Sequence, residues 1–319
     1  MRLTRITGAD LNVFDFDYDL TWAVFFLSAD QKIYGRYGGR DARHPDERLS
    51  LPGLRYAMQA ALAAHRQNGG RPAAPAEKPL RVEDFPAAKG RRGECIHCHQ
   101  VYEYRRAADK EAGRWKREDL WVYPLPENVG LTLEVDVGNR VQAVAPGSPA
   151  ARLGLRPGDL VQSINGIAVT SFADAQYGLH RAPAKGQTPI TWLRDGKPMS
   201  GQLELAEGWR KTNLTWRTSL LDVLPSLSLY GEDLTPAQKK ALGLSAKRLA
   251  FQQDKVVHAD MRKAGVQPGD IIIGINNEAL EMSMLEFLGH VRRNYLVGDA
   301  ITLNLLRDGK RIDLPMTLR

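Results

Sequence analysis

Two stretches of this chain carry nearly the same phrase: Leu155–Gly166 reads LRPGDLVQSING, and Val266–Asn277 reads VQPGDIIIGINN. In each stretch a Pro-Gly-Asp turn leads into a short apolar run, and the run ends in Asn at a second turn. This punctuation is typical of short β-strands in a small sheet domain. The two stretches therefore predict two related β-rich units within one chain.

A second phrase, LRDGK, also occurs twice, at Leu193–Lys197 and Leu306–Lys310. Its Asp-Gly pair predicts a tight hairpin, because the turn needs positive φ and glycine supplies it without steric cost. The copies of the first phrase are 111 residues apart, and those of the second phrase are 113 apart. A period of this size indicates tandem domains rather than a solenoid.

The paired phrases resemble PDZ domains, in the strand order of bacterial HtrA-type proteins, over residues 125–208 (the first copy) and 220–319 (the second copy). A PDZ domain adds a peptide or protein C-terminus as a strand beside its own edge strand, and loop N–H groups hold the terminal carboxylate. The second copy resembles the HtrA pattern more closely, because it also carries Asp233–Pro236 and a helical stretch up to Leu244. The resemblance implies peptide partners for both copies.

The resemblance assigns binding residues in each copy. In the first copy the loop and binding strand would use Val129, Gly130, Leu131 and Leu133. The facing helix wall, whose residues share one face by their spacing, would be Phe172, Gln176, Leu179 and His180. In the second copy the loop would be Leu227, Ser228 and Leu229, and the wall Met284, Leu288 and Val291. Ser228 stands where the family usually has glycine, and each apolar residue in these sets could equally belong to the core.

Residues 1–68 predict three strands and a helix: a polar start, the apolar stretch Leu20–Leu27, Ile33–Gly39, and helical spacing of apolar residues after Ser50. This order resembles the second half of a thioredoxin fold, but it lacks the proline before the first of the apolar strands and the earlier strand–helix unit. The expected fold class is therefore α+β and multidomain. It combines a partial thioredoxin-like α/β segment with two tandem PDZ domains, which are small β-barrels or sandwiches with helices.

The same combination resembles a bacterial family of thioredoxin-like/PDZ fusion proteins, some of which are selenoproteins. This resemblance suggests that the true start lies upstream of Met1, missed through a recoded selenocysteine or an overlooked start codon. A degenerate half-domain that serves only as a packing platform is the alternative.

Residues 69–124 form a Pro/Ala-rich linker and a helical segment that contains Cys95-Ile-His-Cys98-His99. As a dithiol switch, Cys95 would be the attacking thiolate and Cys98 the resolving thiol. A covalent c-type haem would instead take both thiols and His99 as an axial ligand. Zinc held by both cysteines with His97 or His99 lacks an evident fourth ligand, and the cysteines could also be inert. The sequence predicts no certain cofactor and no metal site.

The composition is that of an ordinary globular protein: 319 residues, 43% apolar and 25% charged, with a net charge of +7. Basic residues are mixed with acidic ones except between Lys89 and Arg117, which favours a solvated face over a nucleic-acid partner. No apolar run approaches the roughly 18 residues of a membrane span, and the N-terminus has no signal-peptide core. By resemblance we expect the bacterial periplasm or cell envelope, or the cytoplasm if the start is authentic.

These observations predict a redox-linked adaptor of the bacterial envelope, in which PDZ domains capture C-termini or extended strands and the cysteines form a switch, as in a thiol–disulfide oxidoreductase. A non-enzymatic PDZ scaffold and a haem electron carrier docked by PDZ domains are the alternatives. A protease is not expected, because no residue before 125 offers a Gly-x-Ser-Gly nucleophile, and Ser148 lies inside a PDZ phrase. The sequence does not predict the peptide ligand, the redox partner or the oligomeric state.

Overall fold

The computed structural model describes residues 5–67, 78–89 and 96–319. The chain divides into two compact units, residues 1–219 and 220–319, which we call the first and second units. The first unit holds the first copy of the paired phrases, and the second unit holds the second copy. None of the described helices is long and apolar enough to cross a membrane.

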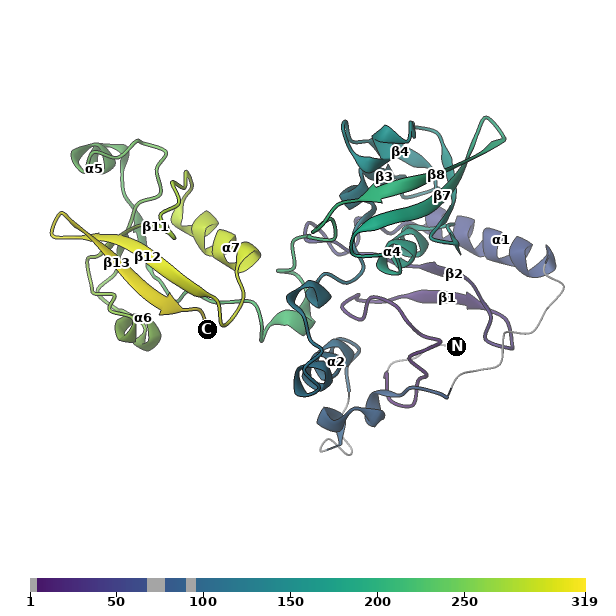
Figure 1. The fold of residues 1–319 in the computed structure, drawn as a ribbon, viewed down its shortest axis with the longest axis horizontal. Coiled ribbons are helices and arrows are strands. Elements are labelled where there is room, and N and C mark those ends of the chain that lie inside the picture. The colour runs from purple at the N-terminus through teal and green to yellow at the C-terminus, as the bar shows by residue number, and fades with distance from the viewer. Residues whose placement is uncertain (1–4, 68–77, 90–95) are drawn as a thin grey trace. The chain divides into compact units, whose positions relative to one another are not determined.

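The first unit is a mixed α+β structure (Figure 1). Its strands are β1 (Val24–Leu27), β2 (Ile33–Tyr37), β3 (Leu131–Leu133), β4 (Val141–Val144), β5 (Leu160–Ile164), β6 (Ile167–Ala168), β7 (Gly186–Arg194) and β8 (Lys197–Leu205). Its α-helices are α1 (Leu51–Gln67), α2 (Gln100–Glu111), α3 (Pro149–Arg152) and α4 (Phe172–His180). The short 3-10 helices of the chain are η1 (Val82–Asp84), η2 (Pro86–Ala88), η3 (Arg117–Leu120), η4 (Pro126–Val129) and η5 (Thr218–Leu220).

The first copy folds into a four-stranded antiparallel sheet in the order β6-β5-β7-β8 and a two-stranded sheet of β3 and β4. The inward residues of these strands and of α4 form one core, in which Val161, Leu179 and Ile190 are fully buried. Ser171 begins α4, because its hydroxyl accepts a hydrogen bond from the Asp174 N–H and so satisfies a free helix donor. The periodicity of apolar residues thus places α4 against the sheet.

The N-terminal part of the first unit has two strands where the sequence predicts three. β1 and β2 form an antiparallel hairpin, and α1 follows it, capped at its start by Ser50. The polar start folds into turns rather than a strand, and these turns place its carboxylates in an ion pair. Both Asp17 and Asp19 contact the buried guanidinium of Arg217, at 2.7 and 3.1 Å. This network fastens the start of the chain to the end of the first unit.

The second unit contains one five-stranded antiparallel sheet in the order β13-β12-β11-β10-β9. Its strands are β9 (Gly231–Asp233), β10 (Phe251–Gln253), β11 (Ile271–Ile275), β12 (Ala300–Arg307) and β13 (Lys310–Thr317). Its helices are α5 (Pro236–Ala241), α6 (Ala259–Lys263) and α7 (Met284–Asn294). Figure 1 shows α6 and α7 on opposite sides of the β12–β13 hairpin. The order leaves β9 at one edge of the sheet.

The repeated phrases build the same ion pair in both copies, between a buried carboxylate and a partly exposed arginine. Arg194 Nε and Nη2 donate to the two carboxylate oxygens of Asp159 at 2.9 and 2.8 Å. Arg307 makes the matching bonds to Asp270 at 2.7 and 2.8 Å. Burial alone would raise the pKa of Asp159, but the bonds from Arg194 and from a backbone N–H hold it below its ordinary value. Each pair ties the Pro-Gly-Asp turn to the LRDGK hairpin.

Candidate peptide-binding sites

The loop before β9 presents three backbone donors in the second copy. The N–H groups of Leu227, Ser228 and Leu229 donate no hydrogen bond to any described residue. The side chains of Leu227 and Leu229 point into the core of the second unit, where both are buried. The loop is therefore anchored by its apolar side chains while its backbone donors remain available to a ligand.

α7 supplies an apolar wall beside this edge strand. Ser283 and Glu286 form a capping box that begins the helix, and the Met284 N–H donates to the Asp233 carboxylate at the end of β9, at 2.9 Å. Met284 and Leu288 are half-buried and pack on the same core cluster as the loop leucines. Val291, by contrast, is fully buried and belongs to the core. The structure thus brings the predicted loop and wall of the second copy together.

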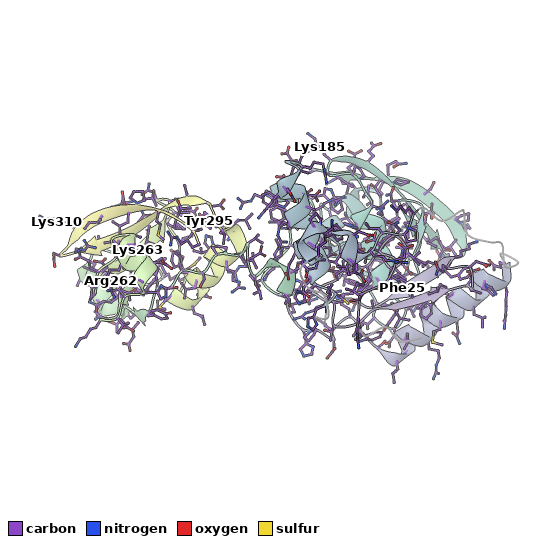
Figure 2. All side chains as sticks on the ribbon, turned by 90° about the horizontal axis from the view of Figure 1, so that it is seen from below. Phe25, Lys185, Arg262, Lys263, Tyr295 and Lys310 are labelled. Atoms are coloured by element: carbon purple, nitrogen blue, oxygen red, sulfur yellow. The ribbon has the colours of Figure 1, made fainter. Side chains whose placement is uncertain are left out.

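A cavity of about 420 Å³ adjoins the same loop. It is lined by Ser226, Leu227, Ser228, Asp260, Met261, Lys263, Ala264, Pro315, Met316, Thr317, Leu318 and Arg319. Arg319 contacts the Asp260 carboxylate at 3.2 Å, whereas Lys263 forms no ion pair with a described residue. Figure 2 shows Lys263 on α6, apart from Tyr295, which follows α7. With Arg319 paired to Asp260, Lys263 is the cationic side chain left without an ion pair among the described residues that line this cavity, and it favours an anionic ligand there.

The corresponding loop of the first copy is closed on itself. It forms the 3-10 helix η4, in which the Gly130 N–H donates to the Glu127 carbonyl oxygen at 2.9 Å. Gly130 has a φ of 87°, and a Cβ at this position would overlap Ser148, the residue that caps α3. The flanking residues Val129 and Leu131 are fully buried. The Gly130 N–H is therefore occupied within its own turn, whereas the corresponding N–H groups of the second copy have no acceptor among the described residues.

The predicted helix wall of the first copy is covered by other segments of the first unit. Gln176 is buried, and its Nε2 donates to the Tyr123 carbonyl oxygen at 2.9 Å. His180 stacks on the Tyr123 ring at 4.3 Å, and burial together with nearby arginines lowers its pKa to about 3. Phe172 lies under Arg48, and Leu179 and Leu133 belong to the core. The structure leaves none of the four predicted wall residues open.

The cysteine segment is only partly within the described residues, because Cys95 lies outside them. The helix that follows the cysteine segment, α2, runs from Gln100 to Glu111. Cys98 is half-buried, and burial raises the pKa of its thiol. The His99 Nδ1 lies 2.8 Å from Glu103 Oε1, and the ring stacks on His97. No group of three or more metal-ligating side chains occurs among the described residues.

Sequence reasoning missed three kinds of residue. Lys263 and Arg319 carry no motif, and only the fold places them beside the loop. Arg48 sits in a polar stretch that looks like an ordinary loop. Gly53 did offer a signal, because a glycine inside a predicted helix often marks a close approach of another backbone. In the structure, the backbone oxygen of Val135 lies against Gly53.

The PDZ domain family matches residues 140–194. The chain is 31% identical over 149 residues to the periplasmic pH-dependent serine endoprotease DegQ of Escherichia coli (strain K12), covering 46% of this chain and 30% of DegQ. It is 26% identical over 175 residues to the periplasmic serine endoprotease DegP of the same organism, covering 54% of this chain and 34% of DegP. A solved structure of the HtrA-type protease AlgW with tripeptide matches 52% of this chain and 55% of its own chain, at 14% identity and a TM-score of 0.27. The chain spans about a third of the length of these two curated relatives.

These relatives correct the functional expectations. They are serine endoproteases, so the predicted redox-linked adaptor, with its thiol–disulfide oxidoreductase activity, is wrong. The two alternatives, a haem carrier and a purely non-enzymatic scaffold, are wrong for the same reason. The expectation that the chain is not a protease is wrong for the same reason. The thioredoxin-like fusion family and its selenoproteins are withdrawn, because the relatives are HtrA-type proteins.

The comparisons confirm the coarser part of the peptide-binding prediction, that the chain contains a PDZ domain. The match over residues 140–194 covers β4 through β7, including the first Pro-Gly-Asp phrase and α4. The named relatives are periplasmic proteins. Residues 140–194 therefore form a PDZ domain, in a chain that is homologous to the HtrA-type proteins DegQ and DegP.

Proposed function

We propose that this chain recognises peptides for serine proteolysis of the HtrA type in the bacterial periplasm. We also propose that residues 220–319 form a second PDZ domain and that this second copy carries the open peptide site. The observation that supports this assignment is the set of backbone donors at 227–229, which have no acceptor among the described residues. They precede an edge strand, as a carboxylate-binding loop requires, and the cavity beside them is lined from α6 and β13 rather than from α7.

The arrangement accounts for each part of an extended peptide. The terminal carboxylate accepts hydrogen bonds from the N–H groups of Leu227, Ser228 and Leu229, and Lys263 adds favourable potential nearby. The peptide backbone pairs with the outer edge of β9, which no described strand occupies. Alternate side chains then rest on Met284 and Leu288, so peptides with apolar residues near the C-terminus are selected.

We propose proteolysis because the relatives are endoproteases; they are about three times as long as the part that this chain matches. In this function the PDZ copies select and hold a polypeptide, and a serine nucleophile cleaves it. A fluorophosphonate probe, which reacts with activated serines, tests the catalytic part on the natural protein isolated from cells. Labelling of that protein is expected, and its absence under conditions that label DegQ would contradict this part of the proposal.

The binding part is tested with an octapeptide pool that carries apolar residues at its last four positions and a free C-terminal carboxylate. Leu288→Glu places a charge on the proposed wall, and we expect at least a tenfold loss of affinity, which corresponds to about 1.4 kcal/mol. Leu285→Glu is the matched control, because Leu285 lies on the same helix and is 79% exposed. The same peptides with a C-terminal amide should also bind at least tenfold more weakly.

Equal affinity of the Leu288→Glu and Leu285→Glu variants would contradict the site on α7. Equal affinity of the carboxylate and amide pools would instead show that the loop donors do not hold a chain terminus. The second result would leave strand addition along β9 in place but would remove C-terminal recognition from the proposal.

A further inference from the structure

Residues 36–56, which we call the strap, run beside the binding strand of the first copy. At the start of this strand, Arg48 Nη1 pairs with Glu127 Oε1 of η4 at 2.8 Å. Past its end, Gly53 contacts the backbone oxygen of Val135 so closely that a Cβ would overlap it. The strap therefore contacts the chain on both sides of β3, at the predicted carboxylate loop and beyond the last residue of the strand.

The strap also engages the facing helix of the same copy. The Arg36 N–H donates to Asp174 Oδ1 at 2.8 Å, and the Arg36 carbonyl accepts from Ser171 Oγ at 2.6 Å. The Arg48 guanidinium lies 4.6 Å from the centre of the Phe172 ring. Asp41 positions Arg48 through two bonds, at 3.3 and 2.9 Å. One arginine side chain thus touches both the loop and the helix between which a PDZ domain holds its peptide.

β3 is nevertheless built like an edge strand. It pairs only with β4 in a two-stranded sheet, so its other side has no strand partner among the described residues. Between Tyr37 and Leu51 the strap has neither helix nor strand and is held by side-chain contacts rather than by a backbone ladder. A segment held in this way opens more easily than the sheet on which it lies.

We infer that the strap keeps the peptide site of the first copy closed, and that displacing it uncovers a second peptide site on the chain. The inference rests on the proposed function, because it assumes that peptides add beside a PDZ edge strand. The first copy then binds peptide only in the fraction of molecules whose strap is open, so its apparent affinity is reduced by that fraction. With the strap closed, the first copy is folded but binds no peptide. With the strap open, the chain holds two peptides at once, one on each copy.

Gly53→Ala is the sharpest variant, because it removes no contact group. Alanine favours a helix over glycine by about 1 kcal/mol, so α1 itself is not weakened. The new Cβ meets the Val135 backbone oxygen, which cannot move aside like a side chain. Met58→Ala on the same helix is the control, since Met58 is 52% exposed. Arg48→Met, with Arg43→Met as its control, tests the other end of the strap.

Native mass spectrometry of the full chain with the carboxylate octapeptide pool counts the bound peptides. We expect one peptide on the unaltered chain and on both controls, and two on Gly53→Ala and Arg48→Met. Adding Leu288→Glu to Gly53→Ala should return the count to one, because it removes the site of the second copy. Hydrogen exchange of the amides at 131–135 should accelerate at least tenfold in Gly53→Ala, while those at 161–164 keep their protection.

Each result separates the two proposals. One peptide on every variant, or two on the unaltered chain, overturns the strap as a closing element. No peptide on the unaltered chain but one on Gly53→Ala overturns the assignment of the open site to the second copy and supports the strap. If no variant binds the pool, exchange decides: unchanged protection at 131–135 in both Gly53→Ala and Arg48→Met overturns the strap.

Discussion

The first and second copies share their turns and their Arg–Asp ion pairs, but they differ in the loop before the edge strand. In the first copy the Gly130 N–H is bonded inside η4, and the strap contacts the chain on both sides of the strand that follows. In the second copy the N–H groups at 227–229 have no acceptor among the described residues, and a cavity adjoins them. Under the two proposals above, what packs around this loop decides whether a copy is a closed platform or an open site.

The largest effect should come from the feature that the copies share. Asp159→Ala removes the buried carboxylate that accepts from Arg194 and from the Arg156 N–H, and Asp270→Ala removes the one that accepts from Arg307 and the Gln267 N–H. We expect each change to lower the free energy of unfolding by about 2–3 kcal/mol. All six tryptophans precede residue 220, so their fluorescence reports the first unit, and circular dichroism reports both units. Urea titrations should show the Asp159→Ala loss by fluorescence and the Asp270→Ala loss only by circular dichroism.

Lys197→Ala and Lys310→Ala are the controls, because both lysines are exposed in the same hairpins. If Asp270→Ala shifted the fluorescence transition as far as Asp159→Ala does, the units would not unfold independently. If only one of the two aspartate variants lost stability, the ion pairs of the two copies would have the same geometry but contribute differently to the free energy of unfolding.

The sequence predicts the shared features well, because they are local. The repeated turns need positive φ at Asn165, Asp195, Asn276 and Asp308, and all four residues have it. The PDZ domain at 140–194 is confirmed, whereas the second PDZ domain stays a prediction. The closing of the first copy depends on partners far apart in the chain, such as Arg48 and Glu127. No periodicity encodes such a pair, so the sequence could not show which site is open.

The helix caps should sharpen the comparison through pH. Asp174 and Glu286 lie three residues after the capping serines of α4 and α7. Burial raises the pKa of Asp174 to about 6, whereas bonds from Ser283 lower the pKa of the exposed Glu286. A carboxyl with a raised folded pKa binds more protons when folded, so its contribution to stability falls as pH rises from about 4 to about 6. Asp174→Asn should remove this fall, on the order of 2 kcal/mol, from the fluorescence-monitored transition.

Glu286→Gln should act in the opposite direction. Its lowered folded pKa stabilises the second unit above the ordinary glutamate pKa of 4.5, and that contribution is lost as the pH falls through the lowered value. Urea titrations at pH 3, 4, 5, 6 and 7, followed by both probes, measure the two variants side by side. Parallel pH profiles for the two variants would mean that Asp174 is solvated in solution and that the strap does not cover it.

The smallest effect concerns the loops themselves. Gly130→Ala should cost about 1–2 kcal/mol, because alanine is strained at a φ of 87° and its Cβ displaces the Ser148 cap of α3. Ser228 is not among the residues with positive φ, so Ser228→Gly should change the free energy of unfolding by less than about 0.5 kcal/mol. Fluorescence measures the first variant and circular dichroism the second. Glycine is thus required where the loop closes on its own turn, and a serine suffices where the donors stay free. If Gly130→Ala left the free energy of unfolding unchanged, this distinction would fail, because the loop of the first copy would then accept a side chain as the loop of the second copy does.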